Sequence, residues 1–95
     1  MRLYDFWSSS SAYRVRIALA LKGLSYERVV TRRLNGVEEP GYFAVNPQGF
    51  VPTLEEDGRR IMQSWAILEY LEERHPDPPL LPPTPAARAR VRALM

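Results

Sequence analysis

Six of the nine prolines of this chain lie in one short segment, residues 75–85, HPDPPLLPPTP. Proline has no backbone N–H and fixes its own φ angle, so neither a helix interior nor a central strand tolerates such a density. The segment therefore predicts a semi-rigid linker and a domain boundary. We expect one domain over residues 1–80. Residues 81–95 would hold the end of the linker and the first helix of an all-helical domain, in a longer protein.

The residues before the linker alternate between strand and helix patterns. The aromatic-rich residues 2–7, RLYDFW, favour a first strand, and residues 26–30, YERVV, favour a second. Between them, the hydroxyls of Ser8 to Ser11 suit a helix start, and Gly23 suits its end. The apolar stripe of this helix is predicted from Val15, Ile17, Ala18, Leu19, Leu21 and Leu24. A strand, a helix and a strand in about thirty residues form a βαβ unit with parallel strands.

The next part of the chain predicts a hairpin and a second helix. Residues 31–45 contain breakers such as Pro40, so we expect a loop with one irregular helix. Residues 46–52, NPQGFVP, form turns, and residues 53–62 form a hairpin around Asp57-Gly58. A helix capped by Ser64 follows, with Ile67, Leu68 and Leu71 inward and Glu69, Glu72, Glu73 and Arg74 outward. The whole order is βαβ followed by ββα, the thioredoxin-like arrangement of an α/β domain.

Composition limits the chemistry of this chain. The absence of cysteine excludes a disulfide scaffold, a cysteine-ligated zinc site and a protein dithiol. Any thiol chemistry must therefore use the thiol of a ligand. The single histidine, His75, cannot form a multi-histidine metal site, and we expect it at a solvated helix end. A net charge of +2 from scattered residues does not imply nucleic-acid binding. Without a membrane span or secretion signal, a cytoplasmic protein is expected.

Two motifs in the second half of the chain indicate a ligand site, although each also has an ordinary structural explanation. The bond between Val51 and Pro52 can be cis and leave the Val51 backbone free to pair with an extended peptide; alternatively, Pro52 is a turn proline. At Gln63-Ser64 a helix start can bind a carboxylate, or the serine is only a cap.

The first helix carries two further candidate features. Its serine hydroxyls and positive helix end can stabilise a thiolate, or the serines only cap the helix. Arg14 and Arg16 can pair with an acidic substrate, although such residues are usually solvated on an amphipathic helix.

Together these motifs resemble the N-terminal, glutathione-binding domain of the zeta-class glutathione transferases, the maleylacetoacetate and maleylpyruvate isomerases. The resemblance covers essentially all 95 residues. It rests on LYDFWSSSSAYRVRIALALKGLSYE, NPQGFVPTL, QSWAILEYLEERHP and the closing LLP…RARVRAL, which occur in the family's order and spacing. The resemblance implies that glutathione is the cofactor, that the protein is a homodimer and that its substrate is a small acidic electrophile.

The resemblance also implies residue roles. Ser9 matches the catalytic serine, whose hydroxyl favours the glutathione thiolate, and Ser10 is its supporting neighbour. The implied glutathione-binding residues are Ser9, Gln48, Val51, Pro52 with a cis bond, Gln63 and Ser64. The implied substrate-binding residues are Ser8, Ser11 and Arg14. In these isomerases the thiolate adds to a cis double bond, the resulting single bond rotates, and elimination returns glutathione with a trans product.

One position departs from the family pattern. Members commonly carry arginine just before the catalytic serine, where this chain has Ser8. Losing one charge-assisted pair removes about 1.5–3 kcal/mol of dicarboxylate recognition. A transferase acting on small α-halo acids therefore stays an alternative, as does a binding or scaffold module without turnover.

Overall fold

A mixed sheet of four strands, in the order β2-β1-β5-β6, forms the centre of the fold. The strands are β1 (Arg2–Asp5), β2 (Glu27–Val30), β5 (Thr53–Glu56) and β6 (Arg59–Met62). β2 runs parallel to β1, β5 runs antiparallel to β1, and β6 runs antiparallel to β5. The computed structural model describes residues 1–6, 9–31, 33–34, 37–38, 40–46 and 50–94. The predicted βαβ unit and the hairpin are confirmed.

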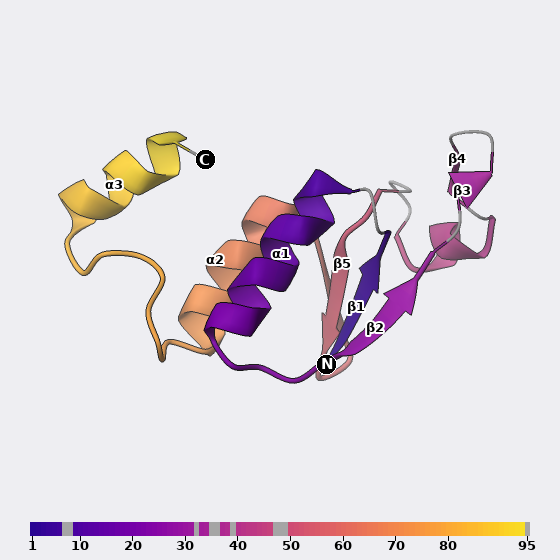
Figure 1. Ribbon diagram of the computed structural model, residues 1–95, viewed down its shortest axis with the longest axis horizontal. Helices are drawn as coiled ribbons and strands as arrows, with labels where there is room; N and C mark the ends of the chain where they lie inside the picture. The colour runs from indigo at the N-terminus through magenta and orange to yellow at the C-terminus, as the bar shows by residue number, and fades with distance from the viewer. Residues whose placement is uncertain (7–8, 32, 35–36, 39, 47–49, 95) are drawn as a thin grey trace.

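Two helices cover one face of this sheet (Figure 1). α1 (Ser10–Leu21) connects β1 to β2, and α2 (Ser64–Arg74) follows β6. The central core cluster consists of Leu3, Val15, Ala18, Leu19, Leu54, Ile67 and Leu71. Leu3 and Leu54 lie opposite each other on neighbouring strands. The two helices therefore share one hydrophobic core with the centre of the sheet.

The buried face of α1 differs from the predicted one. Its buried residues are Ala12, Val15, Ala18 and Leu19. Ile17 and Leu21 are 42% and 60% exposed, so the prediction that they face the core was wrong. Apolar residues occupy most of the circumference of this helix, so their spacing alone does not select the side that packs.

Positive φ angles mark the two turns that the sequence predicts. Gly23 ends α1 with a φ of +67°, and the Leu24 N–H donates to the Leu19 carbonyl at 3.0 Å, as in a Schellman motif. In the β5–β6 hairpin, Asp57 and Gly58 have φ angles of +52° and +75°, which is the type I′ pattern. Both predicted turns are confirmed.

The segment after β2 contains more structure than predicted. Two strands of two residues each, β3 (Arg33–Leu34) and β4 (Val37–Glu38), form a small antiparallel ribbon. The short 3₁₀ helix η1 (Pro40–Ala44) follows and confirms the predicted irregular helix. The ribbon was missed because strands this short show no alternation of apolar and polar residues.

A buried ion pair ties the proline-rich segment to α1 and α2. Lys22 Nζ donates to Glu72 Oε1 at 3.1 Å and to the carbonyls of His75 at 2.7 Å and Pro78 at 2.9 Å. The Glu72 carboxylate also accepts from the backbone N–H groups of Leu80 and Leu81. Burial raises the pKa of Glu72, but these hydrogen bonds outweigh it and hold the pKa below its usual range. The prediction that Glu72 faces outward was therefore wrong.

The last helix, α3 (Pro85–Leu94), begins where predicted, with Thr84 Oγ1 accepting from the Ala87 N–H at 3.3 Å. In Figure 1 it lies beyond the proline-rich segment, to one side of the sheet and the helix pair. Arg92 donates to both carboxylate oxygens of Glu69 on α2, at 2.8 and 2.9 Å. This pair links α3 to α2 on the surface.

Two other charged groups expected in solvent instead have partners inside the fold. Arg16 Nη1 donates to both oxygens of the buried Asp5 carboxylate, at 2.7 and 2.6 Å, and Arg28 donates to the same carboxylate. The sequence suggested that Arg16 is either solvated or available to a substrate. It is neither, because it is paired with Asp5. His75 is half-buried, and its Nε2 lies 2.9 Å from Glu56 Oε2, so the expectation of a solvated histidine was also wrong.

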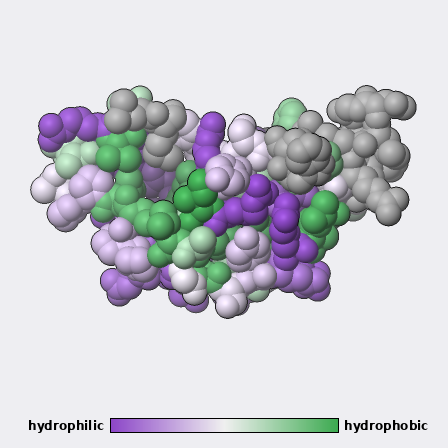
Figure 2. All heavy atoms as spheres, in the orientation of Figure 1, coloured by the Kyte–Doolittle hydropathy of each residue, from purple (hydrophilic) through white to green (hydrophobic). Residues whose placement is uncertain are grey.

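Apolar surface is exposed on the side of the molecule where α1 and α2 lie. Figure 2 shows hydrophobic residues there among polar ones. Ile17 and Leu21 on α1 and Leu80 after α2 are among the exposed large hydrophobic residues. Within the described ranges, no helix has the length and apolar character needed to cross a membrane.

Candidate functional site

Helix α1 begins at the serine run, as predicted. Ser9 is the N-cap residue, with φ −77° and ψ 117°. Its Oγ accepts a hydrogen bond from the Ala12 N–H at 3.1 Å. A serine hydroxyl has one proton and two lone pairs, so this bond leaves the proton for another acceptor. Ser9 therefore presents an oriented hydroxyl that can donate to an anion at the start of α1.

Helix α2 begins differently from the prediction. Its N-cap is Gln63, and Ser64 is its first helical residue, so the prediction of Ser64 as the cap was wrong. Gln63 has a φ of +74° and makes no side-chain cap hydrogen bond. A non-glycine residue in this left-handed region costs roughly 1–3 kcal/mol and is typical of functional sites. The chain enters α2 through a strained backbone, without a side-chain cap from Gln63.

A cavity of about 140 Å³ lies between these two helix starts and the segment that precedes β5. The described residues that line it are Ser11, Phe50, Val51, Pro52, Gln63 and Ser64. Figure 1 shows that α1, α2 and β5 begin at the same end of the sheet. None of the described lining residues is charged. The positive ends of the two helix dipoles therefore give this cavity a preference for an anionic group.

The segment before β5 contributes Phe50, Val51 and Pro52 to the cavity lining. The bond between Val51 and Pro52 is cis, as predicted. None of the hydrogen bonds found among the described residues involves the Val51 backbone. An extended ligand can therefore pair with Val51 in the way a neighbouring strand would.

The structure brings five of the predicted site residues into one cavity lining. They are Ser11, Val51, Pro52, Gln63 and Ser64. Ser9 and Ser10 lie at the start of α1 but not among the described lining residues, and Ser10 is exposed. Arg14 is exposed on α1. The remaining predicted residues, Ser8 and Gln48, lie outside the described residues.

The cavity can bind and orient a ligand, but its described lining offers no strong nucleophile. The sequence contains no cysteine, and the described lining contains no histidine or carboxylate to activate a hydroxyl. In the described part of the chain, no three histidine, cysteine, aspartate or glutamate side chains gather into a metal-binding group. Because the sequence contains no cysteine, a thiol that reacts here must belong to a ligand.

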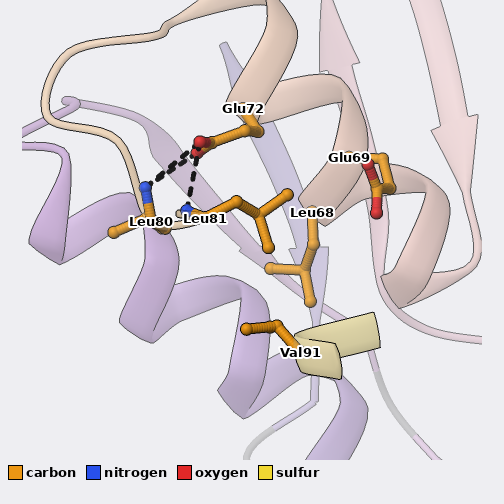
Figure 3. Close-up of a pocket in the computed structure, with 6 residues that line it drawn as sticks. All are labelled: Leu68, Glu69, Glu72, Leu80, Leu81 and Val91. Carbon is orange, nitrogen blue, oxygen red and sulfur yellow. Dashed lines mark hydrogen bonds between the residues drawn. The ribbon is translucent and has the colours of Figure 1, made fainter. Parts of the chain in front are cut away.

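A second cavity, of about 210 Å³, lies between α2, the proline-rich segment and α3. Figure 3 shows the side chains of Leu68, Leu81 and Val91 around it and the Glu72 carboxylate turned to the backbone N–H groups at Leu80 and Leu81. Its polar edge is therefore already satisfied by the protein. This cavity is lined mostly by aliphatic groups and offers less chemistry than the first.

A comparison with protein families supports the site described above. The family described as "Glutathione S-transferase, N-terminal domain" matches residues 8–74. The chain belongs to this family. The match includes both packed helices, β2 and the hairpin, so it contains every described residue that lines the first cavity.

Individual relatives support the same family assignment. The chain is 52% identical to a maleylacetoacetate isomerase of Pseudomonas aeruginosa, over 99% of the chain and 46% of the relative. It resembles the holo structure of a maleylpyruvate isomerase, a bacterial zeta-class glutathione S-transferase, with a TM-score of 0.90, 46% identity and coverage of 99% of the chain and 45% of that protein.

A maleylacetoacetate isomerase from Anaeromyxobacter dehalogenans 2CP-1, solved with glutathione in its active site, has a TM-score of 0.79 and 54% identity. That match covers 98% of the chain and 45% of the isomerase. The chain thus spans less than half the length of these relatives. The predicted family and the thioredoxin-like fold class are confirmed.

Sequence reasoning missed the buried polar residues that support the site. Tyr42, Asn46 and Thr53 form hydrogen bonds to one another or to the Phe50 carbonyl, directly behind the cavity-lining segment. The turn-rich NPQGFVP motif signals that this backbone is irregular. Nothing in this motif indicates that Tyr42, four residues before its first residue, completes the network.

Proposed function

We propose that this chain binds glutathione in the cavity between α1, α2 and the segment before β5. The protein that contains it would be a zeta-class, glutathione-dependent cis–trans isomerase of maleylacetoacetate or maleylpyruvate. The observation that carries this proposal is the convergence of two helix starts and Val51 on one cavity whose described lining is uncharged. The relatives named isomerases, one of them solved with glutathione, support the same reaction.

The residues present fit this tripeptide. The start of α2, at Gln63 and Ser64, suits the γ-glutamyl carboxylate because its N–H groups and dipole favour an anion. The Val51 backbone suits the cysteinyl part, because it has no hydrogen-bond partner among the described residues. Gln48 would contribute to the glycyl end. Ser9, supported by Ser10, would donate its hydroxyl proton to the sulfur and so favour the thiolate.

Bound glutathione would supply the thiolate that adds to the cis double bond and leaves again after rotation about the single bond. The chain's own part is to bind, orient and stabilise charge. The Ser9 hydroxyl and the start of α1 hold negative charge at the sulfur. Ser8, Ser11 and Arg14 are the residues we assign to the substrate's acidic groups.

The wider organisation is part of the same proposal. Residues 1–80 would be the glutathione-binding domain, and residues 81–95 would lead into a helical domain. The short share of each relative that the chain matches is consistent with this division. We further infer a cytoplasmic homodimer that acts on a small acidic electrophile.

The proposal predicts specific effects at Ser9. Calorimetric titration should show glutathione binding, and the bound thiol should titrate below its free value of about 8.5. Replacing Ser9 with alanine should lower maleylpyruvate turnover roughly 100-fold, the scale for losing one donor to a developing anion, with little change in glutathione affinity. The absence of glutathione binding would refute the proposal.

A second substitution separates the chemistry from the helix cap. Ser9→Asp keeps an N-cap acceptor for the Ala12 N–H but cannot donate a proton to the sulfur. It should retain the stability of the protein and lose turnover. Ser25→Ala, at an exposed serine between α1 and β2, is the matched control and should change neither. Full turnover in Ser9→Asp would remove Ser9 from the mechanism.

A further inference from the structure

A network of buried polar groups is hydrogen-bonded to the Phe50 carbonyl, in the cavity-lining segment. The Phe50 carbonyl accepts from the Tyr42 hydroxyl at 2.6 Å and from Asn46 Nδ2 at 2.8 Å. Thr53 Oγ1 lies 2.6 Å from the same Tyr42 hydroxyl and 3.4 Å from Asn46 Nδ2. Tyr42 is 3% exposed, Asn46 is 1% exposed and Thr53 is fully buried.

The donors and acceptors of this network can be assigned from chemistry alone. A carbonyl only accepts, so the tyrosine proton points to Phe50. The Thr53 hydroxyl must then donate to the tyrosine oxygen, and it accepts from Asn46 in return. Each hydroxyl therefore has a defined orientation. Because unpaired buried polar groups are costly, this arrangement stabilises one position of the Phe50 carbonyl.

The position of this carbonyl determines where the next N–H points. The peptide unit between Phe50 and Val51 is planar and trans, so its carbonyl and its N–H point in opposite directions. The network holds the Phe50 carbonyl on the inner side, toward η1 and β5. The Val51 N–H is therefore turned away from the network, and Val51 itself lines the cavity.

We propose that Tyr42, Asn46 and Thr53 are positioning residues for ligand binding, because they hold the Val51 N–H in the direction that an extended thiol peptide needs. This inference rests on the proposed function, in which glutathione pairs with Val51. None of the three side chains is among the described lining residues, so they act through the backbone. Without the network, the ligand would have to order this segment on binding.

Calorimetric titration of the 95-residue chain with glutathione tests the inference. Tyr42→Phe removes one hydroxyl from the network and should weaken glutathione about tenfold, which corresponds to ~1.4 kcal/mol. Thr53→Val removes the other hydroxyl at nearly constant volume and should act in the same direction. Tyr70→Phe is the matched control. It also removes a phenol hydroxyl that donates a hydrogen bond, to Glu56, but neither Tyr70 nor Glu56 is bonded to the cavity-lining segment or among its described lining residues. It should leave the affinity within a factor of two.

Amide hydrogen exchange supplies a readout that general destabilisation would not produce. In the wild-type chain, glutathione should slow exchange at the Val51 amide and at the first amides of α2. With glutathione at the same multiple of each variant's dissociation constant, the protection at Val51 in Tyr42→Phe should fall about tenfold, while the protection at Ser64 should persist. Equal loss at both positions would show that the network acts on overall stability, and would overturn the inference.

The outcomes separate this inference from the proposed function. If the wild-type chain binds no glutathione, both are wrong. If it binds glutathione and both Tyr42→Phe and Thr53→Val bind as tightly as wild type, only the positioning role is wrong. If Tyr42→Phe does not fold, Thr53→Val decides by the same two measurements.

Discussion

Replacing Lys22 with methionine removes a charged group from a buried site in which it has three hydrogen-bond acceptors. The Lys22 side chain is fully buried, and its ammonium group donates to three oxygens at 3.1, 2.7 and 2.9 Å. An ammonium group has three protons, so every donor is used. Methionine is apolar and about as long as the lysine stem, so the substitution tests the charge of Lys22 rather than its packing.

The expected loss of stability follows from what remains after the substitution. The Glu72 carboxylate keeps its two backbone donors but loses its cation, and two carbonyl groups lose their donor. Removing one partner of a buried ion pair costs about 3–5 kcal/mol. The total stability of a small domain is only about 5–15 kcal/mol. Lys22→Met should therefore remove a large part of the free energy of unfolding.

The pH dependence of this loss has a definite sign. The pKa of Glu72 is lowered in the folded chain, so its pairing contributes stability above its unfolded pKa. That contribution disappears as the pH falls through the folded pKa, in the range below about 4.3. The difference between wild type and Lys22→Met should therefore be largest at neutral pH and should shrink in acid, where Glu72 becomes neutral.

Urea unfolding of the single and double variants provides the measurement. Lys22→Met, Glu72→Gln and the double variant form a cycle, and the losses of the single variants should exceed the loss of the double variant by at least about 1 kcal/mol. Glu73→Gln, at an exposed neighbour, is the matched control and should stay within about 0.5 kcal/mol. Additive losses, or a loss below about 1 kcal/mol for Lys22→Met, would refute the argument.

Two further substitutions test other parts of the fold by the same unfolding measurement. Asp5→Asn should cost about 3 kcal/mol, because it leaves the guanidinium of Arg16 beside a neutral buried group; an unchanged midpoint would contradict the role of this pair. Gly58→Ala should cost roughly 1 kcal/mol or more, because the turn holds residue 58 at φ +75°, while space for the added methyl group is open. Equal stability of Gly58→Ala and wild type would exclude strain at this turn.

The parts of the fold that the sequence predicts are those controlled by local chemistry. Glycine at a positive φ ends α1 and forms the hairpin turn, and the serine run caps α1. Each depends on residues within a few positions of one another, so spacing and residue type suffice.

The errors share a different cause, which is contact between distant parts of the chain. Glu72 was predicted in solvent because α2 alone gives it an outward position, and its burial depends on Lys22, 50 residues earlier, and on the backbone of Leu80 and Leu81. Arg16 was expected either in solvent or beside an acidic substrate, and only β1 and β2 show that it pairs with Asp5 beside Arg28. Local periodicity contains no information on such partners. The same limit hid the network behind Val51.

The distribution of charge explains why the cavity depends on backbone groups. Several charged side chains already have protein partners: Asp5 binds two arginines, Glu72 binds Lys22, and Glu56 lies beside His75. A side chain that neutralises an internal carboxylate contributes little field elsewhere, whereas the first N–H groups of a helix have no acceptor in the helix's own hydrogen-bond ladder, and among the described residues of α1 only the Ala12 N–H is seen to be capped, by Ser9. The anion preference of the cavity therefore comes from where the chain begins its helices. Gln63, with its φ of +74°, lies at the turn from β6 into α2, and the start of α2 lines the same cavity as the segment before β5.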